Sequence, residues 1–262
     1  MHLRPFHQSD IPRISDIIAI CDADDPVVQY CHPHMLKYWD AYRRSGTRAI
    51  LRKMATGGVC WVAETDEGDP WPAAMRDSQG PRPGGFVVGF ALWKRVGNSQ
   101  VAKNWQRPCR DWDRRIDSFL HSLQGSYIDL FHLDPSADPV RHQSVLKTLG
   151  RPVDAEIFAE AWEMSALCVA PEYQRRRVGT TLLKWGLDQA AAENVPVFVQ
   201  ASPVGVKLYT SCGFQAFEKI LCDDLDLEEP MYYLVWERPD WNGRVFELAK
   251  KKAEGTAAGR AA

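Results

Sequence analysis

The feature that most constrains the fold of this sequence is a turn that joins an apolar strand to an amphipathic helix. The strand is predicted to end at Ala170, and the helix to begin near Gly179. Between them lies the run Gln174, Arg175, Arg176 and Arg177, which is followed by Val178, Gly179 and Thr180. A helix start offers unpaired backbone N–H groups and the positive end of the helix dipole. With the arginines beside it, this turn predicts a site for an anionic cofactor.

The overall charge excludes several partners. The 262 residues include 32 Lys and Arg against 34 Asp and Glu, a formal charge of −2, so no general basic field is available for nucleic acid or an anionic membrane. The seven cysteines are scattered and include no Cys-x-x-Cys pair, which indicates reduced thiols. We find no signal peptide and no long apolar run, and therefore expect a cytoplasmic protein, with a nuclear address also open.

The apolar pattern predicts alternating strands and helices. A strand, a crossover helix and a second strand at residues 162–200 imply a parallel or mixed sheet. We expect one domain over 1–249, with a mobile loop at 64–85, an insertion at about 98–160 and a disordered tail at 250–262. Strands are predicted at 2–6, 59–63, 86–93, 162–170, 195–200, 217–221 and 231–237, and helices at about 9–20, 35–54, 178–193 and 203–211.

Residues 162–220 resemble the GNAT superfamily of acyl-CoA-dependent N-acyltransferases. The family's cofactor motif is Gln or Arg, two variable residues, Gly, one variable residue, then Gly or Ala, and it corresponds here to the run from Gln174 to Gly179. The chain departs from this motif at Arg177, where the family usually has glycine. A second signature, a tyrosine on a short helix followed by Gly-Phe, is similar to Tyr209 with Gly213 and Phe214.

The resemblance implies a mixed, mostly antiparallel α/β sheet with one parallel strand pair, helices on both faces, and acetyl-CoA as co-substrate. It also implies that the strand residues Leu167, Cys168 and Val169 bind the cofactor through backbone groups. The residues that would hold the pyrophosphate are Gln174, Arg175, Arg176, Arg177, Val178, Gly179 and Thr180. Arginine at position 177 is strained if the backbone there has a positive φ and is unstrained in the right-handed helical region, and we favour the second alternative.

Two side chains are candidates for the chemistry. By resemblance, Tyr209 would donate a proton to the departing CoA thiolate, and the alternative is that it is a core aromatic. Glu163 lies eleven residues before Gln174, the position that resembles the general base of the histone-acetyltransferase branch. Glu160 and Asp129 are rival bases, and a plain strand-end carboxylate is the alternative for Glu163.

The function expected is acetyl transfer to a primary amine by direct attack on the thioester. The aromatic-rich insertion favours a small-molecule acceptor. A protein N-terminus or lysine, a hydroxyl acceptor, and a non-catalytic acyl-CoA sensor remain alternatives. No metal is expected, because the run from Cys31 to His34 lacks matched ligands elsewhere. The aromatic and basic residues around Trp105 and Trp112 are interleaved with aspartates, which argues against a nucleic-acid surface. The sequence does not indicate the oligomeric state.

Overall fold

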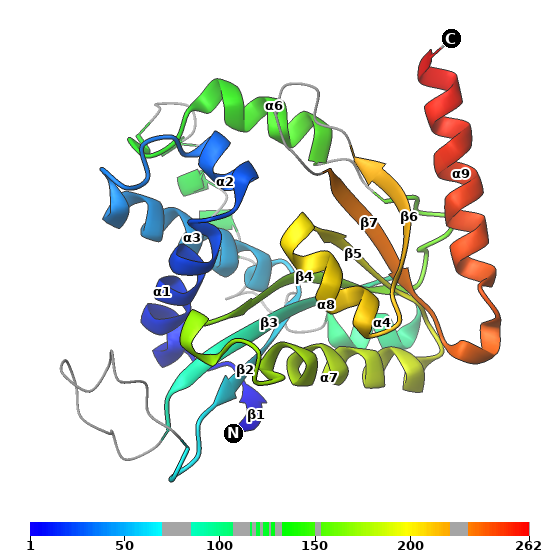
Figure 1. Ribbon diagram of the computed structural model, residues 1–262, viewed down its shortest axis with the longest axis horizontal. Coiled ribbons are helices and arrows are strands. Elements are labelled where there is room, and N and C mark those ends of the chain that lie inside the picture. The colour runs from blue at the N-terminus through cyan, green and yellow to red at the C-terminus, as the bar shows by residue number, and fades with distance from the viewer. Residues whose placement is uncertain are drawn as a thin grey trace.

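The computed structural model describes residues 1–69, 85–106, 133–149, 153–220 and 230–261, with short pieces between 116 and 128 (Figure 1). Side chains of the last helix are described as far as residue 255. Most of the loop predicted at 64–85 and much of the segment 98–160 lie outside the described residues.

A seven-stranded sheet with the order β1-β2-β3-β4-β5-β7-β6 organises the chain. All neighbouring strands are antiparallel except β4 and β5, which are parallel because α7 crosses between them. The mixed, mostly antiparallel fold with one parallel pair is therefore confirmed. The strands are β1 His2–Pro5, β2 Gly58–Glu64, β3 Val87–Val96, β4 Ala161–Val169, β5 Val197–Ala201, β6 Gln215–Ile220 and β7 Met231–Trp236.

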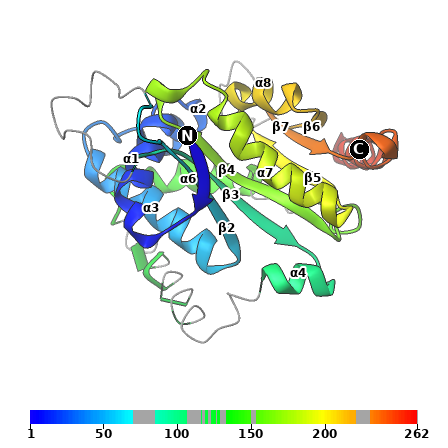
Figure 2. The same cartoon turned by 90° about the horizontal axis from the view of Figure 1, so that it is seen from below.

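Helices cover both faces of the sheet (Figure 2). Helices α1 and α3 lie on one side of β2 and β3, and α7 lies on the other. Alternation along β3 matches this arrangement: the ring of Trp93 lies against Gly186 of α7, whereas Leu92 faces the end of α3. The helices are α1 Ile11–Asp22, α2 Pro26–Cys31, α3 Trp39–Ala55, α4 Gln100–Trp105, α6 Pro139–Leu149, α7 Val178–Glu193, α8 Pro203–Ser211 and α9 Arg244–Ala261.

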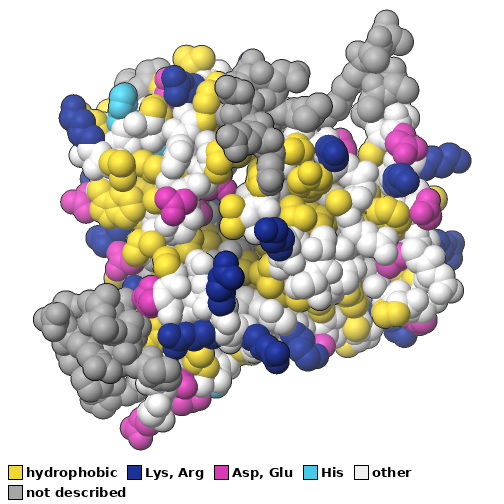
Figure 3. All heavy atoms as spheres, in the orientation of Figure 1, with side chains coloured by type: hydrophobic (Ala, Val, Ile, Leu, Met, Phe, Trp, Pro, Cys, Tyr) yellow, Lys and Arg dark blue, Asp and Glu magenta, His cyan; other side chains and the backbone are white. Residues whose placement is uncertain are grey.

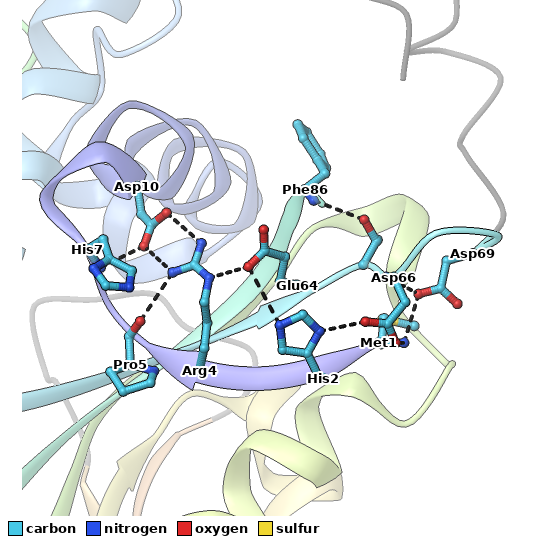
Figure 4. Close-up of polar contacts among 11 residues, drawn as sticks. Met1, His2, Arg4, Pro5, His7, Asp10, Glu64, Asp66, Asp69 and Phe86 are labelled. Atoms are coloured by element: carbon cyan, nitrogen blue, oxygen red, sulfur yellow. Dashed lines mark hydrogen bonds and ion pairs between the residues drawn. The ribbon is translucent and has the colours of Figure 1, made fainter. Parts of the chain in front are cut away.

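A charge network holds the N-terminal edge strand β1 against the rest of the sheet (Figure 4). Arg4 forms a bidentate pair with Asp10, with distances of 2.8 and 2.9 Å, and also contacts Glu64 of β2. Burial acts to raise the pKa of Asp10, but hydrogen bonds from Arg4 and the His7 amide outweigh burial and lower it. Because β1 is short and has one neighbour, these contacts fix its register more firmly than its ladder alone could.

The chain ends in a helix, while disorder of the tail at 250–262 stays a prediction. Helix α9 runs to Ala261, and its buried Ala249 packs with Phe198 of β5 and Val235 of β7. Alanine, lysine and glutamate dominate residues 247–254, and all three are strong helix formers. Helix α9 was not predicted from the sequence. Helix α2 was also not predicted.

Candidate active site

The site begins where β4 separates from its parallel neighbour. Strand β5 pairs with β4 only from Trp162 to Met164, opposite Val197 to Val199. At the same place β4 contains a bulge, since Leu92 of β3 pairs with Ala166 and Trp93 with Met164, leaving Ser165 unmatched. Beyond Met164, no described strand pairs with the edge of β4 that faces β5, so the backbone groups there that no side chain occupies are available to a ligand.

Lys53 of α3 reaches this junction. Its Nζ donates a hydrogen bond to the carbonyl oxygen of Ser165 at 3.0 Å. The protein atoms around the ammonium lower the pKa of Lys53 by desolvation, although the charges of Glu163 and Asp22 oppose this. A cation therefore lies at the bulge of β4, where the charges of Glu163 and Asp22 both act on it.

The turn before α7 has an unusual backbone. Arg175 has φ of 59° and Arg177, the N-cap of α7, has φ of 64° and ψ of 11°, so both are left-handed. The expectation that Arg177 is right-handed was wrong. Positive φ at Arg175 and Arg177, on either side of Arg176, whose φ is not positive, is the alternation typical of an anion-binding nest. Arginine occupies a position that favours glycine, at a cost of roughly 1–2 kcal/mol.

The turn is anchored to β4 and open to solvent. Nε2 of Gln174 donates to the carbonyl oxygen of Val169 at 3.0 Å, which fixes the start of the turn at the end of the strand. Arg175, Arg176 and Arg177 are all exposed. Figure 3 shows Lys and Arg side chains along the lower middle of this face, over the start of α7 in Figure 1. The first-turn amides of α7 have no intrahelical acceptor, so amides and guanidinium groups together suit a phosphate.

A cavity of 630 Å³, here named the cradle cavity, joins this turn to the open edge of β4. Its wall includes nearly all of the cofactor residues predicted from the sequence, the exception being Arg176. The wall also includes the end of α1 and the start of α8, which were not among the predicted cofactor residues. The predicted residues in the wall are Leu167, Cys168, Val169, Gln174, Arg175, Arg177, Val178, Gly179 and Thr180.

A second cavity of 710 Å³, here named the Glu163 cavity, lies against the preceding stretch of β4. Glu163, Met164 and Ser165 line it, whereas the cradle cavity begins at Leu167. Its remaining wall combines aromatic and polar side chains from β3, β5, β7 and α3, among them Phe198, Tyr233, Gln200, Lys94 and Lys53. Two cavities thus approach the bent part of β4 from adjacent positions, one beside a phosphate cradle.

Tyr209 of α8 is 7% exposed and lies behind the wall of the cradle cavity, next to the wall residue Gly205. Its ring contacts Phe214 edge-on, with 5.4 Å between centroids. Burial and the nearby Cys168 thiol raise the pKa of Tyr209, so its phenol stays protonated at neutral pH. Tyr209 is therefore both a packed aromatic residue of the core and a neighbour of Cys168. Its phenol is protonated, which is the form that a proton donor requires.

The candidate bases have different surroundings. Glu163 is half-buried, and its Oε1 accepts a hydrogen bond from the Ser165 hydroxyl at 3.0 Å. Burial acts to raise the pKa of Glu160, but hydrogen bonds from Ser99, Asn98 and Arg95 lower it to about 2. Glu160 is thus a structural carboxylate that binds the chain after β3, unsuited to accept a proton. Asp129 lies outside the described residues.

Three site residues were missed by the sequence analysis: Cys21 and Asp22 at the end of α1, and Lys53 of α3. The Cys21 thiol donates to the carbonyl oxygen of Val169 at 3.2 Å, and Asp22 lines the cradle cavity. Asp22 ends an amphipathic helix and is followed closely by Asp24 and Asp25, a pattern equally typical of a solvated helix end. Only the packing of α1 and α3 against the sheet brings these residues to the site.

Other sequence features serve the core. Trp105 packs edge-on against Trp162, with 5.0 Å between centroids, and its Nε1 donates to Glu193 at 2.7 Å. It is therefore not a surface platform for bases, while Trp112 lies outside the described residues. Within the described ranges, no group of three or more His, Cys, Asp or Glu could hold a metal, and no helix has the length and apolarity needed to span a membrane.

The comparisons with known proteins agree with this geometry. Residues 144–216 match the family model for the acetyltransferase (GNAT) domain. Among solved structures, an acetyltransferase from Corynebacterium glutamicum, described as histone acetyltransferase HPA2 and related acetyltransferase, is 19% identical with a TM-score of 0.53. That match covers 90% of this chain and 94% of the other. A mosquito arylalkylamine N-acetyltransferase like 5b is 15% identical with a TM-score of 0.45, covering 90% and 98%. No curated protein matches.

A sheet that opens beside a turn suited to phosphate agrees with the acyl-CoA-dependent acyltransferase class. The matched family model identifies residues 144–216 as an acetyltransferase (GNAT) domain, and the fold of the chain agrees with that of a solved acetyltransferase.

Proposed function

We propose that this protein transfers the acetyl group of acetyl-CoA to a primary amine of a small molecule. The observation that carries the proposal is the meeting of two cavities at the bend of β4, one beside the cradle and one beside Glu163. The amides and arginines of residues 174–180 bind the pyrophosphate. The open edge of β4 then pairs with the pantetheine arm, which directs the thioester toward Ser165. Acetyl-CoA supplies the activated acetyl group.

The chemistry is a direct transfer. The amine nitrogen bonds to the acetyl carbonyl carbon, and the bond between that carbon and sulfur breaks. Tyr209 donates its phenolic proton to the departing thiolate, and the raised pKa of the buried phenol keeps that proton in place at neutral pH until the thiolate forms. Glu163 binds the acceptor's ammonium in the Glu163 cavity and provides one route for its proton. Loss of that proton is required because a protonated amine has no lone pair for attack.

The Glu163 cavity supports a small acceptor. Its 710 Å³ lies in the range of roughly 300–1,000 Å³ that small-molecule sites occupy. Aromatic and aliphatic side chains such as Phe158, Phe198 and Leu149 form part of its wall, and they would contact an apolar acceptor body. An extended peptide would instead need a long open groove with strand-like hydrogen bonds.

Release of CoA thiol tests the proposal. The purified protein is incubated with acetyl-CoA and a panel of arylalkylamines, polyamines, amino acids, and peptides with a free N-terminus or lysine. Faster thiol release with small amines than with peptides supports the proposal, and the opposite order refutes the acceptor class. A melting shift with acetyl-CoA and CoA, without turnover of any amine, would identify a sensor instead.

A further inference from the structure

The carboxylate of Asp22 differs from the other half-buried acidic side chains described at the site. It is half-buried at the last residue of α1 and lines the cradle cavity. Among the described residues it has neither a side-chain hydrogen bond nor an ion pair within 4.0 Å, whereas Glu163 accepts from Ser165 and Glu160 is fully engaged. A half-buried carboxylate is costly unless it is paired, so an unpaired one facing a cavity points to a functional role.

Its neighbours place Asp22 at the reacting end of the cavity. Its charge acts on the Cys168 thiol of β4, and the Cys168 thiol in turn acts on the phenol of Tyr209. Lys53 donates to Ser165 at the bulge of β4, and the charge of Asp22 acts to raise its pKa. Asp22 is therefore close to Cys168 on β4, and Cys168 is close to the group proposed to protonate the leaving thiolate.

We propose that Asp22 is the catalytic residue that accepts the proton of the attacking amine. This inference rests on the proposed function. The amine gives its proton to the Asp22 carboxylate as the nitrogen–carbon bond forms. The carbon–sulfur bond breaks, and the thiolate takes the proton of Tyr209. The products are an amide, CoA thiol, the Asp22 carboxylic acid and the Tyr209 phenolate. Transfer of one proton from the acid to the phenolate through solvent restores the enzyme.

The surroundings of Asp22 suit this role. Burial and the charge of Asp25 raise its pKa to about 7, while Lys53 opposes them. The negative end of the α1 dipole acts in the same direction as Asp25. The other titratable groups on which its charge acts are the Tyr42 phenol and the Cys168 thiol, whose pKa values it helps to raise, and the Cys21 thiol, whose lowered pKa it opposes. A base with a pKa near the working pH has both a large ionised fraction and sufficient basicity.

The test is the pH dependence of kcat/KM for the wild type and Asp22→Asn. Two acceptors whose own amine pKa values differ are used, since a limb that belongs to the enzyme does not move with the acceptor. For the wild type we expect an acidic limb near pH 7 with both acceptors. Asp22→Asn should lose this limb and lose about 10²-fold in rate. Asp22→Glu, which keeps the carboxylate, should retain the limb at a reduced rate.

Two controls separate the explanations. The melting shift with acetyl-CoA should be unchanged in Asp22→Asn, which shows that fold and cofactor binding survive. Asp188→Asn, which neutralises an exposed carboxylate paired with Lys184 on α7, should match the wild type. If Asp22→Asn keeps the limb and rate, the inference is refuted while the proposed function stands. Loss of the limb in Glu163→Gln instead would assign the proton to Glu163. A wild type that binds acetyl-CoA but acetylates no amine would refute the proposed function.

Discussion

Replacing Arg177 by glycine should stabilise the protein. Arg177 has φ of 64° at the N-cap of α7, a conformation that costs a non-glycine residue roughly 1–2 kcal/mol. Glycine removes this strain but adds about 0.4–1 kcal/mol of backbone entropy to the unfolded chain. The net gain is about 0.5–1 kcal/mol, and for a chain of this size it should raise the Tm by about 1–4 °C.

The assay is equilibrium unfolding in urea with matched variants. Arg177→Ala removes the same cation but keeps the strained backbone, so it should remain near the wild type. Arg176→Gly should be destabilised by about 0.5–1 kcal/mol, because residue 176 has no positive φ and its guanidinium contacts the ring of Tyr173 at 5.3 Å. The order Arg177→Gly, Arg177→Ala, Arg176→Gly is the expected ranking of stability.

Cofactor binding provides the second readout. Since the Arg177 side chain is exposed, loss of its charge should weaken acetyl-CoA binding by less than about tenfold, and that loss should be the same for Arg177→Gly and Arg177→Ala. If Arg177→Gly is less stable than Arg177→Ala, the left-handed backbone is not strained, and the reasoning fails.

Three further predictions concern the core and the site. Gly186→Ala should destabilise the protein by about 1–3 kcal/mol in urea unfolding, because the new Cβ would meet the buried Trp93 ring at 2.2 Å. Gly255→Ala is the control: it has open space around it and should be neutral or stabilising. The pKa of Asp22 is about 7 in the folded protein against an ordinary 3.8, so the folded state binds more protons than the unfolded state between these pH values. The free energy of unfolding should therefore fall as pH rises from about 4 to 7. Asp22→Asn should flatten this slope, and an unchanged slope would contradict the prediction. Tyr209→Phe should lower kcat about 10²-fold with an unchanged melting shift for acetyl-CoA, and retained turnover would assign the tyrosine to the core.

Local patterns in the sequence were sufficient for most of the fold. Helices α7 and α8 begin and end where the apolar spacing and Pro203 predicted, and the strands agree within a few residues. The cradle was predicted because its residues are contiguous. Helix α9 was missed because its amphipathic start at Val245 and Phe246 is short, and its packing partners lie on β5, β6 and β7.

The backbone of the cradle and the rest of the site could not be predicted in this way. Whether Arg177 is left-handed depends on how the chain enters α7 from β4, which side-chain identity does not reveal. Asp22 and Lys53 come from α1 and α3, far in sequence from β4, and only the packing of both helices against the sheet brings them together. Their charges then act on each other, which no spacing in the sequence encodes.

The short ladder between β4 and β5 has a mechanical consequence. Three residue pairs connect a half-sheet of β1 to β4 with a half-sheet of β5 to β7, and past Met164 the described strands are not hydrogen-bonded across this seam. A pantetheine arm laid along the open edge would act as a substitute strand and add cohesion between the halves. Amide exchange at the seam should then slow when acetyl-CoA is bound, while exchange deep within β2 and β3 stays the same.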